Sequence, residues 1–212
     1  MIIKSSKSMH EVIYRSLRLK IIMCGEFDPG KTFSIRGLAT QFSVSMTPIR
    51  EATRRLVAEG ALMMSASGRI SVPLVSSIRL KELLSLRLLL EPDLASRAVP
   101  KVHLALIERL CDLNDHLEKM IENDNLLGYL RTNIEFHKTL YLRAQAPTMI
   151  TLLEIIWLQL GPTFKVGCLK SSEILKTTAH HNIISALRIG NQVDLAESVI
   201  ADINNDFRVF MN

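Results

Sequence analysis

The chain of 212 residues contains few cysteines, and their positions argue against two kinds of stabilising chemistry. Cys24, Cys111 and Cys168 are odd in number, far apart and without a C-x-x-C pair. This spacing disfavours a disulfide framework and a thiolate zinc site, and it is typical of proteins of the reducing cytosol. We therefore expect three free, buried thiols.

Long apolar runs are also missing. The two longest stretches, residues 83–90 and 152–160, are interrupted by Arg87 and Glu154. A membrane span needs roughly 18–20 apolar residues. The N-terminal residues lack the apolar segment and the cleavage site of a signal peptide. These absences predict a cytoplasmic protein that makes no contact with a membrane.

Motifs that carry catalysis are absent as well. The sequence contains no nucleophile elbow, no glycine-rich loop that cradles a phosphate, and no H-E-x-x-H helix. Its carboxylates fall mostly on polar helix faces. The sequence therefore predicts that the protein is not an enzyme.

What is present begins with an uneven charge distribution. Residues 1–76 contain 11 Lys and Arg against 5 Asp and Glu, and the rest of the chain contains 15 against 16. The whole positive excess therefore lies in the first third of the sequence. A small basic region followed by a larger neutral one is typical of a polyanion-binding domain attached to a regulatory domain.

The first 75 residues alternate helical and turn signals. Apolar residues recur at helical spacing over residues 10–24, Gly25 begins a turn that continues to Gly30, and a short helix is expected over residues 34–42. Thr47 as N-cap and Pro48 as first helical residue predict a basic helix that ends near Gly60. Residues 62–66 and 69–72 flank Gly68 as a hairpin. This order predicts a winged helix-turn-helix over residues 1–75 whose second helix enters a major groove.

Residues 76–212 carry helical signals throughout, after a linker at residues 73–77. Breaks at proline, glycine and asparagine predict about six helices, with Pro162 kinking or ending the fourth. The six segments are 77–98, 101–124, 126–145, 147–167, 172–189 and 192–211. The predicted fold class is mainly α, with an N-terminal winged helix-turn-helix and a C-terminal helical bundle.

Residues 38–60 carry the pattern L-A-x4-V-S-x-T-P-I-R-E-A-x3-L-x2-E-G. This pattern resembles the signature of the GntR family of bacterial repressors and activators, and the resemblance extends over residues 10–75. It implies that Arg36, Ser45, Thr47 and Arg50 face bases and backbone of DNA, and that Gly68 and Arg69 reach a flanking groove. Met46 departs from the family, which often has a basic residue there.

The arginines of the second helix support this interpretation independently. Arg50, Arg54 and Arg55 follow at helical spacing, and arginine can bind phosphates or the O6 and N7 atoms of guanine in a bidentate manner. For Arg54 and Arg55 the alternative is a solvated helix face. We count Arg54 with the predicted DNA-binding residues.

The second part of the chain resembles the FCD branch of the same family. The matching pieces are E-L-x2-L-R-x3-E from Glu82, F-H-x2-L from Phe136 and H-x2-I-x-A-L from His181. The resemblance implies a helical domain that binds an effector and forms the dimer. In many FCD domains an Asp four residues before the first His completes a metal site.

Arg87 is surrounded in the sequence by leucines, where an unpaired charge is costly. It either pairs with Glu91, four residues on, or points into a cavity and binds a carboxylate of a ligand. The resemblance favours the ligand, and an acidic metabolite would suit Arg87 together with His137 and His181.

The metal-site positions of the family are only partly kept. Asn133 stands where the Asp is expected, and the last position falls near Asp202 or Ile203. His137, His181 and Asp202 could still hold a divalent ion weakly. The favoured alternative is a ligand-binding set of Arg87, Asn133, His137 and His181. His180 points about 100° away from His181 on a helix, and we expect it to be exposed.

Together these observations predict a DNA-binding transcription regulator. It is expected to bind a palindromic operator as a homodimer, with an affinity controlled by a small carboxylate-bearing ligand. The alternatives are a metal-dependent enzyme and an architectural DNA-binding protein that no ligand regulates.

Overall fold

The computed structural model describes residues 9–22, 27–170 and 175–208. It separates into two compact units, Met1–Val75 with Leu158–Thr163, and Ser76–Trp157 with Phe164–Asn212. Cys24 and the turn predicted at Gly25 lie outside the described residues. Of the other two thiols, Cys168 is buried and Cys111 is half-buried.

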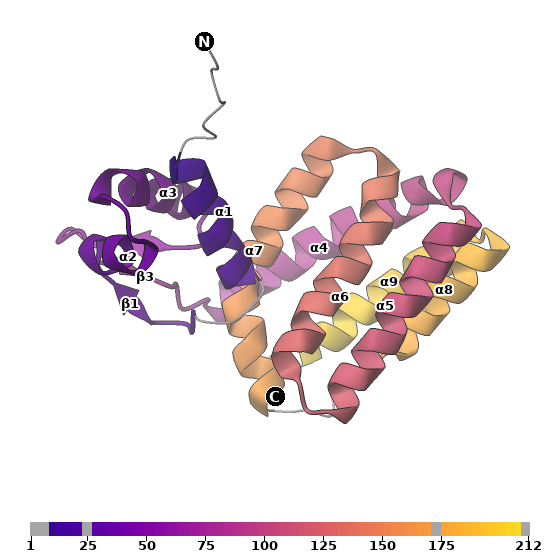
Figure 1. Ribbon diagram of the computed structural model, residues 1–212. Helices are drawn as coiled ribbons and strands as arrows, with labels where there is room; N and C mark the ends of the chain where they lie inside the picture. The colour runs from indigo at the N-terminus through magenta and orange to yellow at the C-terminus, as the bar shows by residue number, and fades with distance from the viewer. Residues whose placement is uncertain (1–8, 23–26, 171–174, 209–212) are drawn as a thin grey trace, which may run out of the picture. The chain divides into compact units, whose positions relative to one another are not determined.

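The first unit combines three helices with a small sheet (Figure 1). Its elements are α1 (Met9–Ile22), β1 (Thr32–Phe33), α2 (Ile35–Phe42), α3 (Met46–Ala58), β2 (Met63–Met64) and β3 (Ile70–Ser71). The strands are antiparallel in the order β1-β3-β2, with Ser71 of β3 opposite Thr32 on one side and Met63 on the other. The predicted winged helix-turn-helix is confirmed. The strand β1 was not predicted, because two residues show no alternating pattern and, unlike the equally short β2 and β3, it does not flank a hairpin glycine.

Capping residues mark both ends of α2 and the start of α3. Ser34 accepts a hydrogen bond from the Gly37 N–H at the start of α2, and Ser43 adopts a left-handed conformation with φ 54° at its end. The N-cap of α3 is Ser45, so the prediction that Thr47 caps this helix is wrong. Pro48 fits inside the first turn because the first N–H groups of a helix have no partner within it.

The core of the first unit lies mainly between α1 and α3. Ile13, Leu17 and Ile21 of α1 are buried, as are Ile49 and Leu56 of α3. This apolar contact sets the position of α3 within the unit.

A polar cluster at one end of these helices supplements the contact. The Arg55 guanidinium lies 3.7 Å from the centre of the Tyr14 ring and donates to Glu11 over 3.0 Å. Tyr14 in turn donates its hydroxyl proton to Glu59 over 2.6 Å. Burial, and then the hydrogen bond to Glu59, raise the pKa of Tyr14 to about 12, so the phenol remains a donor at neutral pH. Arg55 therefore joins α3 to α1.

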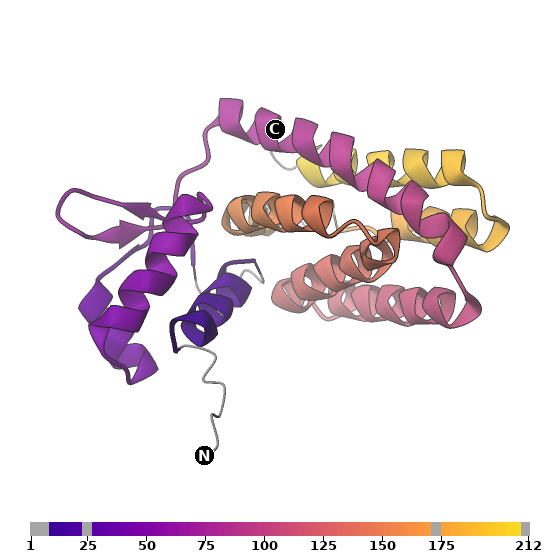
Figure 2. The same cartoon turned by 90° about the horizontal axis from the view of Figure 1, so that it is seen from above.

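The second unit is helical throughout the described part of the chain, as predicted. Its helices are α4 (Ser77–Ala98), α5 (Leu104–Glu122), α6 (Leu126–Tyr141), α7 (Pro147–Lys170) apart from its segment Leu158–Thr163, α8 (Thr178–Ile189) and α9 (Gln192–Phe207). Helix α9 packs along both α4 and α8, and α5 packs along α6 (Figures 1 and 2). The apolar faces of these helices form the core of the unit.

Several boundaries differ from the predictions for local reasons. Helix α5 begins at Leu104 rather than 101, because Val99–Lys101 forms a 3-10 turn and His103 caps the helix through the Leu106 N–H. Helix α6 passes into a second 3-10 turn at Leu142–Ala144. Helix α7 continues through Pro162 to Lys170, so the expected break at Gly167 is wrong. Residues 171–174, between α7 and α8, lie outside the described residues.

Helix α7 has the composition of a possible membrane span. An 18-residue window within its stretch Pro147–Leu169 has a mean hydropathy of 1.3, and half of that window is buried. By length and composition alone this stretch could cross a bilayer, but core helices of soluble proteins share these properties. The observation is therefore weak evidence for a membrane contact.

Replacing Leu56 with Ala should weaken the first unit by about 2–5 kcal/mol, because the deletion leaves a cavity between α1 and α3. Hydrogen exchange of the amides of α1 and α3 measures the free energy of opening of this unit. The control is Arg54→Ala on the exposed side of the same helix, expected to change it by less than about 0.5 kcal/mol. Equal effects of the two substitutions would contradict the packing described above.

Candidate functional site

The exposed side of α3 carries polar and cationic residues. Ser45, Thr47, Arg50 and Arg54 are exposed, whereas the opposite side buries Ile49, Ala52, Thr53 and Leu56. In a helix-turn-helix, the N-terminal residues of the second helix contact base edges in the major groove. The predicted recognition helix and its N-cap thus expose four of the seven residues predicted to contact DNA.

The arginines of this unit differ in their ion pairs. Arg36, Arg50 and Arg69 are exposed, and none of them forms an ion pair within the described residues. Arg54 lies 3.4 Å from Glu51, and Arg55 is held by Glu11 and Glu59. An unpaired guanidinium keeps its donors for phosphate or guanine, so Arg50 is the best-suited base-reading side chain on α3.

The beginning of α3 is also open to a negatively charged partner. The Ser45 side chain makes no capping hydrogen bond, and both Ser45 and Thr47 are exposed. The first N–H groups of a helix lack partners within it and form its positive end. A DNA phosphate is a suitable acceptor for such N–H groups and hydroxyls.

The hairpin tip presents Arg69 through a tight turn. Gly68 has φ 76°, a conformation that residues with a Cβ rarely adopt, and its N–H donates to the Ser65 carbonyl over 2.9 Å. Arg69 follows on the exposed side of the hairpin. The tip is thus a narrow projection that carries one cation.

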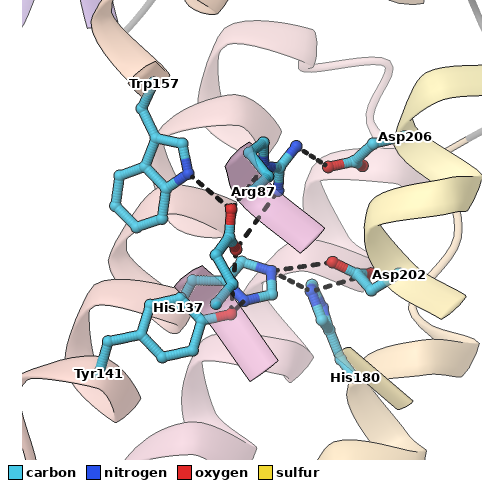
Figure 3. Close-up of polar contacts among 8 residues, drawn as sticks. Arg87, His137, Tyr141, Trp157, His180, Asp202 and Asp206 are labelled. Carbon is cyan, nitrogen blue, oxygen red and sulfur yellow. Dashed lines mark hydrogen bonds and ion pairs between the residues drawn. The ribbon is translucent and has the colours of Figure 1, made fainter. Parts of the chain in front are cut away.

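The second unit contains a buried polar centre around Arg87 of α4 (Figure 3). Arg87 donates through Nε to Glu91 Oε1 over 2.5 Å and through Nη1 to Asp206 Oδ2 over 3.0 Å. Glu91 also accepts from Trp157 Nε1 over 3.2 Å and from the Tyr141 hydroxyl over 3.0 Å. Of the two alternatives for Arg87, the structure shows the pair with Glu91, and it adds Asp206, which the sequence analysis missed.

A second cluster lies beside the first and joins α6, α8 and α9. His137 Nε2 lies 3.0 Å from Asp202 Oδ2 and 3.2 Å from His180 Nε2, and His180 Nε2 lies 3.6 Å from Asp202 Oδ1 (Figure 3). All three residues are buried. The ring of His180 stacks on Phe136 with 4.2 Å between the ring centres, which orients the imidazole towards Asp202.

The hydrogen bonds around His137 determine which of its nitrogens faces the cluster. Tyr141 donates its only hydroxyl proton to Glu91, so its oxygen accepts from the Nδ1–H of His137 over 3.2 Å. The Nε2 atom of a neutral His137 therefore directs a lone pair at Asp202. A lone pair and a carboxylate repel each other unless a proton or a metal ion lies between them.

The pKa values of the cluster reflect burial and close charges. Burial lowers the pKa of His180 to about 4, which keeps it neutral at pH 7. Burial also opposes the protonation of His137, but the hydrogen bond and charge of Asp202 outweigh it and raise the pKa of His137. Burial, and then the charge of Asp202, raise the pKa of Asp206 to about 7 despite its pairing with Arg87.

The donor set of the second cluster fits a divalent cation. Ligands at about 2.0–2.1 Å from a tetrahedral ion lie about 3.3 Å from one another, close to the separations among His137, His180 and Asp202. With neutral histidines and all three carboxylates ionised, the two clusters contain one guanidinium and an excess of two negative charges. Asn133, four residues before His137 on α6, is buried and could add an amide oxygen.

The sequence analysis assigned the two adjacent histidines of α8 the wrong way round. His180 is fully buried, whereas the His181 side chain is 59% exposed and lies 3.5 Å from Glu118 at the surface. The signal was present in the sequence, because His180 shares helical spacing with the apolar residues Ile183, Ile184 and Leu187. His181 falls in line with Ser185 and Arg188, which are exposed.

The fold and these sites define a class of protein: a winged-helix DNA-binding regulator with a helical second domain. The chain belongs to the GntR family, because residues 10–72 match the family described as bacterial regulatory proteins, gntR family, and residues 82–205 match the FCD domain.

Known regulators are similar to the chain over most of its length. The HTH-type transcriptional regulator McbR of Escherichia coli K12 is 29% identical over 138 residues, 65% of this chain and 62% of McbR. The gluconate operon transcriptional repressor of Bacillus subtilis is 27% identical over 158 residues, 74% of this chain and 63% of the repressor. The chain thus spans less than two thirds of both. LutR of B. subtilis is 29% identical, with 87% of this chain and 94% of LutR covered.

Solved structures share the fold. The structure of E. coli McbR/YncC has a TM-score of 0.87 at 22% identity and covers 95% of this chain and 96% of its own. A GntR regulator of Rhodococcus sp. RHA1 has a TM-score of 0.78 at 20% identity. The match covers 95% of this chain and 97% of the Rhodococcus chain. The relatives are transcription regulators and not enzymes, which confirms that expectation.

The raised pKa of Asp206 predicts a pH-dependent effect of Asp206→Asn. The folded-state pKa of about 7 exceeds the ordinary 3.8, so this group contributes stability that is full below 3.8 and is lost as pH rises towards 7. Asn does not titrate. The Tm of the variant minus that of the wild type should therefore rise from pH 4 to pH 7, measured by calorimetry with a chelator present. A difference independent of pH would contradict the assignment, since the opposite linkage of His180 is common to both proteins.

Proposed function

We propose that the protein is a homodimeric bacterial transcription regulator that binds a palindromic operator, and that a ligand in its helical unit controls operator affinity. We place it in the cytoplasm, where the chromosome is accessible to it. The DNA-binding role of residues 1–75 and the sensing role of residues 76–212 are part of this proposal. The observation that carries it is the presence in one chain of a winged helix and a buried acidic cluster. Helix α3 of the winged helix exposes Arg50, which has no ion-pair partner among the described residues.

The homodimer follows from the way helix-turn-helix proteins read DNA. Two half-sites related by a two-fold axis are bound by two copies related by the same axis. Helix α4 offers a surface for the second copy, because Ile78, Leu86 and Leu89 are 73%, 42% and 72% exposed.

The ligand is a divalent cation held by His137, His180 and Asp202, together with a small carboxylate-bearing molecule. The cation offsets the negative excess of the two clusters and supplies positions at which a carboxylate can bind. Glu91 and Asp206 already neutralise Arg87, so a free acid has little reason to enter without the cation. The gluconate operon repressor of B. subtilis, a relative, is named for the operon of a sugar acid, which supports a ligand of this class.

Replacing Arg50 with Ala should weaken operator binding by about 1–3 kcal/mol, because the variant loses one bidentate contact to a base. Fluorescence anisotropy with an operator selected by the wild type measures this loss. Wild-type affinity should also fall steeply with salt through counterion release. The control is Arg109→Ala on α5, which belongs neither to the proposed DNA contacts nor to the proposed dimer surface and should leave affinity unchanged. Wild-type affinity in Arg50→Ala would overturn the assignment of α3 as the recognition helix.

The adjacent histidines of α8 offer a matched pair for the cation site. His180→Ala should weaken Zn²⁺ binding at least about 10-fold, since even changes outside the ligand set cost about that much. His181→Ala should bind Zn²⁺ like the wild type, because its imidazole is exposed. Competition with a fluorescent chelator measures both affinities, and circular dichroism verifies folding. Equal affinities of the two variants would remove the cation site from the proposal.

A further inference from the structure

An exposed methionine stands at the start of the recognition helix. Met46 is the first residue of α3, and its side chain is 46% exposed. It lies four residues before Arg50, so the two side chains share one side of the helix. The exposed neighbours, Ser45 and Thr47, are polar. A single exposed apolar residue is ordinary on a protein surface. This one, however, lies at the start of the helix that we propose to enter the major groove.

Methionine restricts what this position can recognise. Its thioether has no hydrogen-bond donor and is a weak acceptor, so Met46 cannot bind a phosphate or the acceptor atoms of guanine. Among the four bases, only thymine presents an apolar group, its C5-methyl, in the major groove. A flexible, polarisable side chain suits contact with a methyl group.

We propose that Met46 is a specificity-determining residue that selects thymine in the operator half-site by apolar contact with the C5-methyl group. The inference rests on the proposed role of α3 as the recognition helix, in which Arg50 reads one base. It adds a second base near the first, which Met46 selects. The same position with a cation would instead favour guanine.

The helix geometry fixes where this thymine lies. Residues four apart are separated by about 6 Å along a helix, and successive base pairs of one strand are about 3.4 Å apart. The thymine therefore lies within about two base pairs of the base that depends on Arg50. Two determinants so close together make a short, recognisable core of each half-site.

Selection from a randomised duplex library with the full-length protein tests the position. The wild type and Met46→Leu should enrich thymine at one position of the half-site, and Met46→Arg should enrich guanine there. Arg50→Ala should lose its preference at a different position within two base pairs. Leu19→Arg adds the same charge at an exposed site on α1 and should leave every base preference unchanged.

Removal of the methyl group alone provides the sharper measurement. Deoxyuridine in place of that thymine should weaken wild-type binding about 4-fold, the effect of one buried methyl group. Met46→Ala should bind the two duplexes equally. Because Met46 is exposed at the helix start, the variants should retain the wild-type Tm.

The outcomes separate this inference from the proposal beneath it. If Arg50→Ala loses a base preference while all Met46 variants select the same motif, only the role of Met46 is overturned. The same holds if deoxyuridine and thymidine duplexes bind the wild type equally. If Arg50→Ala also selects the unchanged motif, α3 is not the recognition helix and both are overturned.

Discussion

The helical unit depends on the compensation of one buried charge, that of Arg87. A guanidinium without a partner in the interior costs several kcal/mol. The chain meets this cost with Glu91 on the same helix and Asp206 on α9, so the ion pairs join α4 to α9. Glu91 then fixes Tyr141 and Trp157, and Tyr141 fixes the imidazole of His137. The orientation of a histidine on α6 thus follows from a charge on α4.

The buried carboxylates around Arg87 outnumber it, and the resulting negative charge determines what the helical unit can bind. Glu91, Asp202 and Asp206 are buried together with a single arginine, and His180 cannot help because burial lowers its pKa to about 4. The centre therefore favours a bound cation, whether protons or a metal ion. Asp202 and Asp206 lie four residues apart on α9 and face inward together. One helix thus contacts both the histidine pair and Arg87.

The fold was largely predictable because its signals are local and repeated. Helical periodicity predicted all six helices of the second unit, and Pro48 with the turn at Gly68 predicted the winged helix. Strand β1 was missed because no hairpin turn beside it marks its position. The site was predicted less well. His137 and Asp202 were found, but His180 and His181 differ by one residue, and only the alignment of His180 with Ile183 and Leu187 separates them. Asp206 was missed because its partner Arg87 lies 119 positions away, beyond any local pattern.

Charge pairing also separates structural from binding residues in the first unit. Arg50 and Arg55 lie on one helix, yet Arg55 is held between Tyr14, Glu11 and Glu59, while Arg50 has no ion-pair partner within the described residues. An arginine saturated by acids of its own chain stabilises the fold and has few donors left. An arginine that the fold leaves exposed and unpaired keeps all its donors for another molecule. Composition alone cannot make this distinction, because it depends on which acids the fold brings within reach.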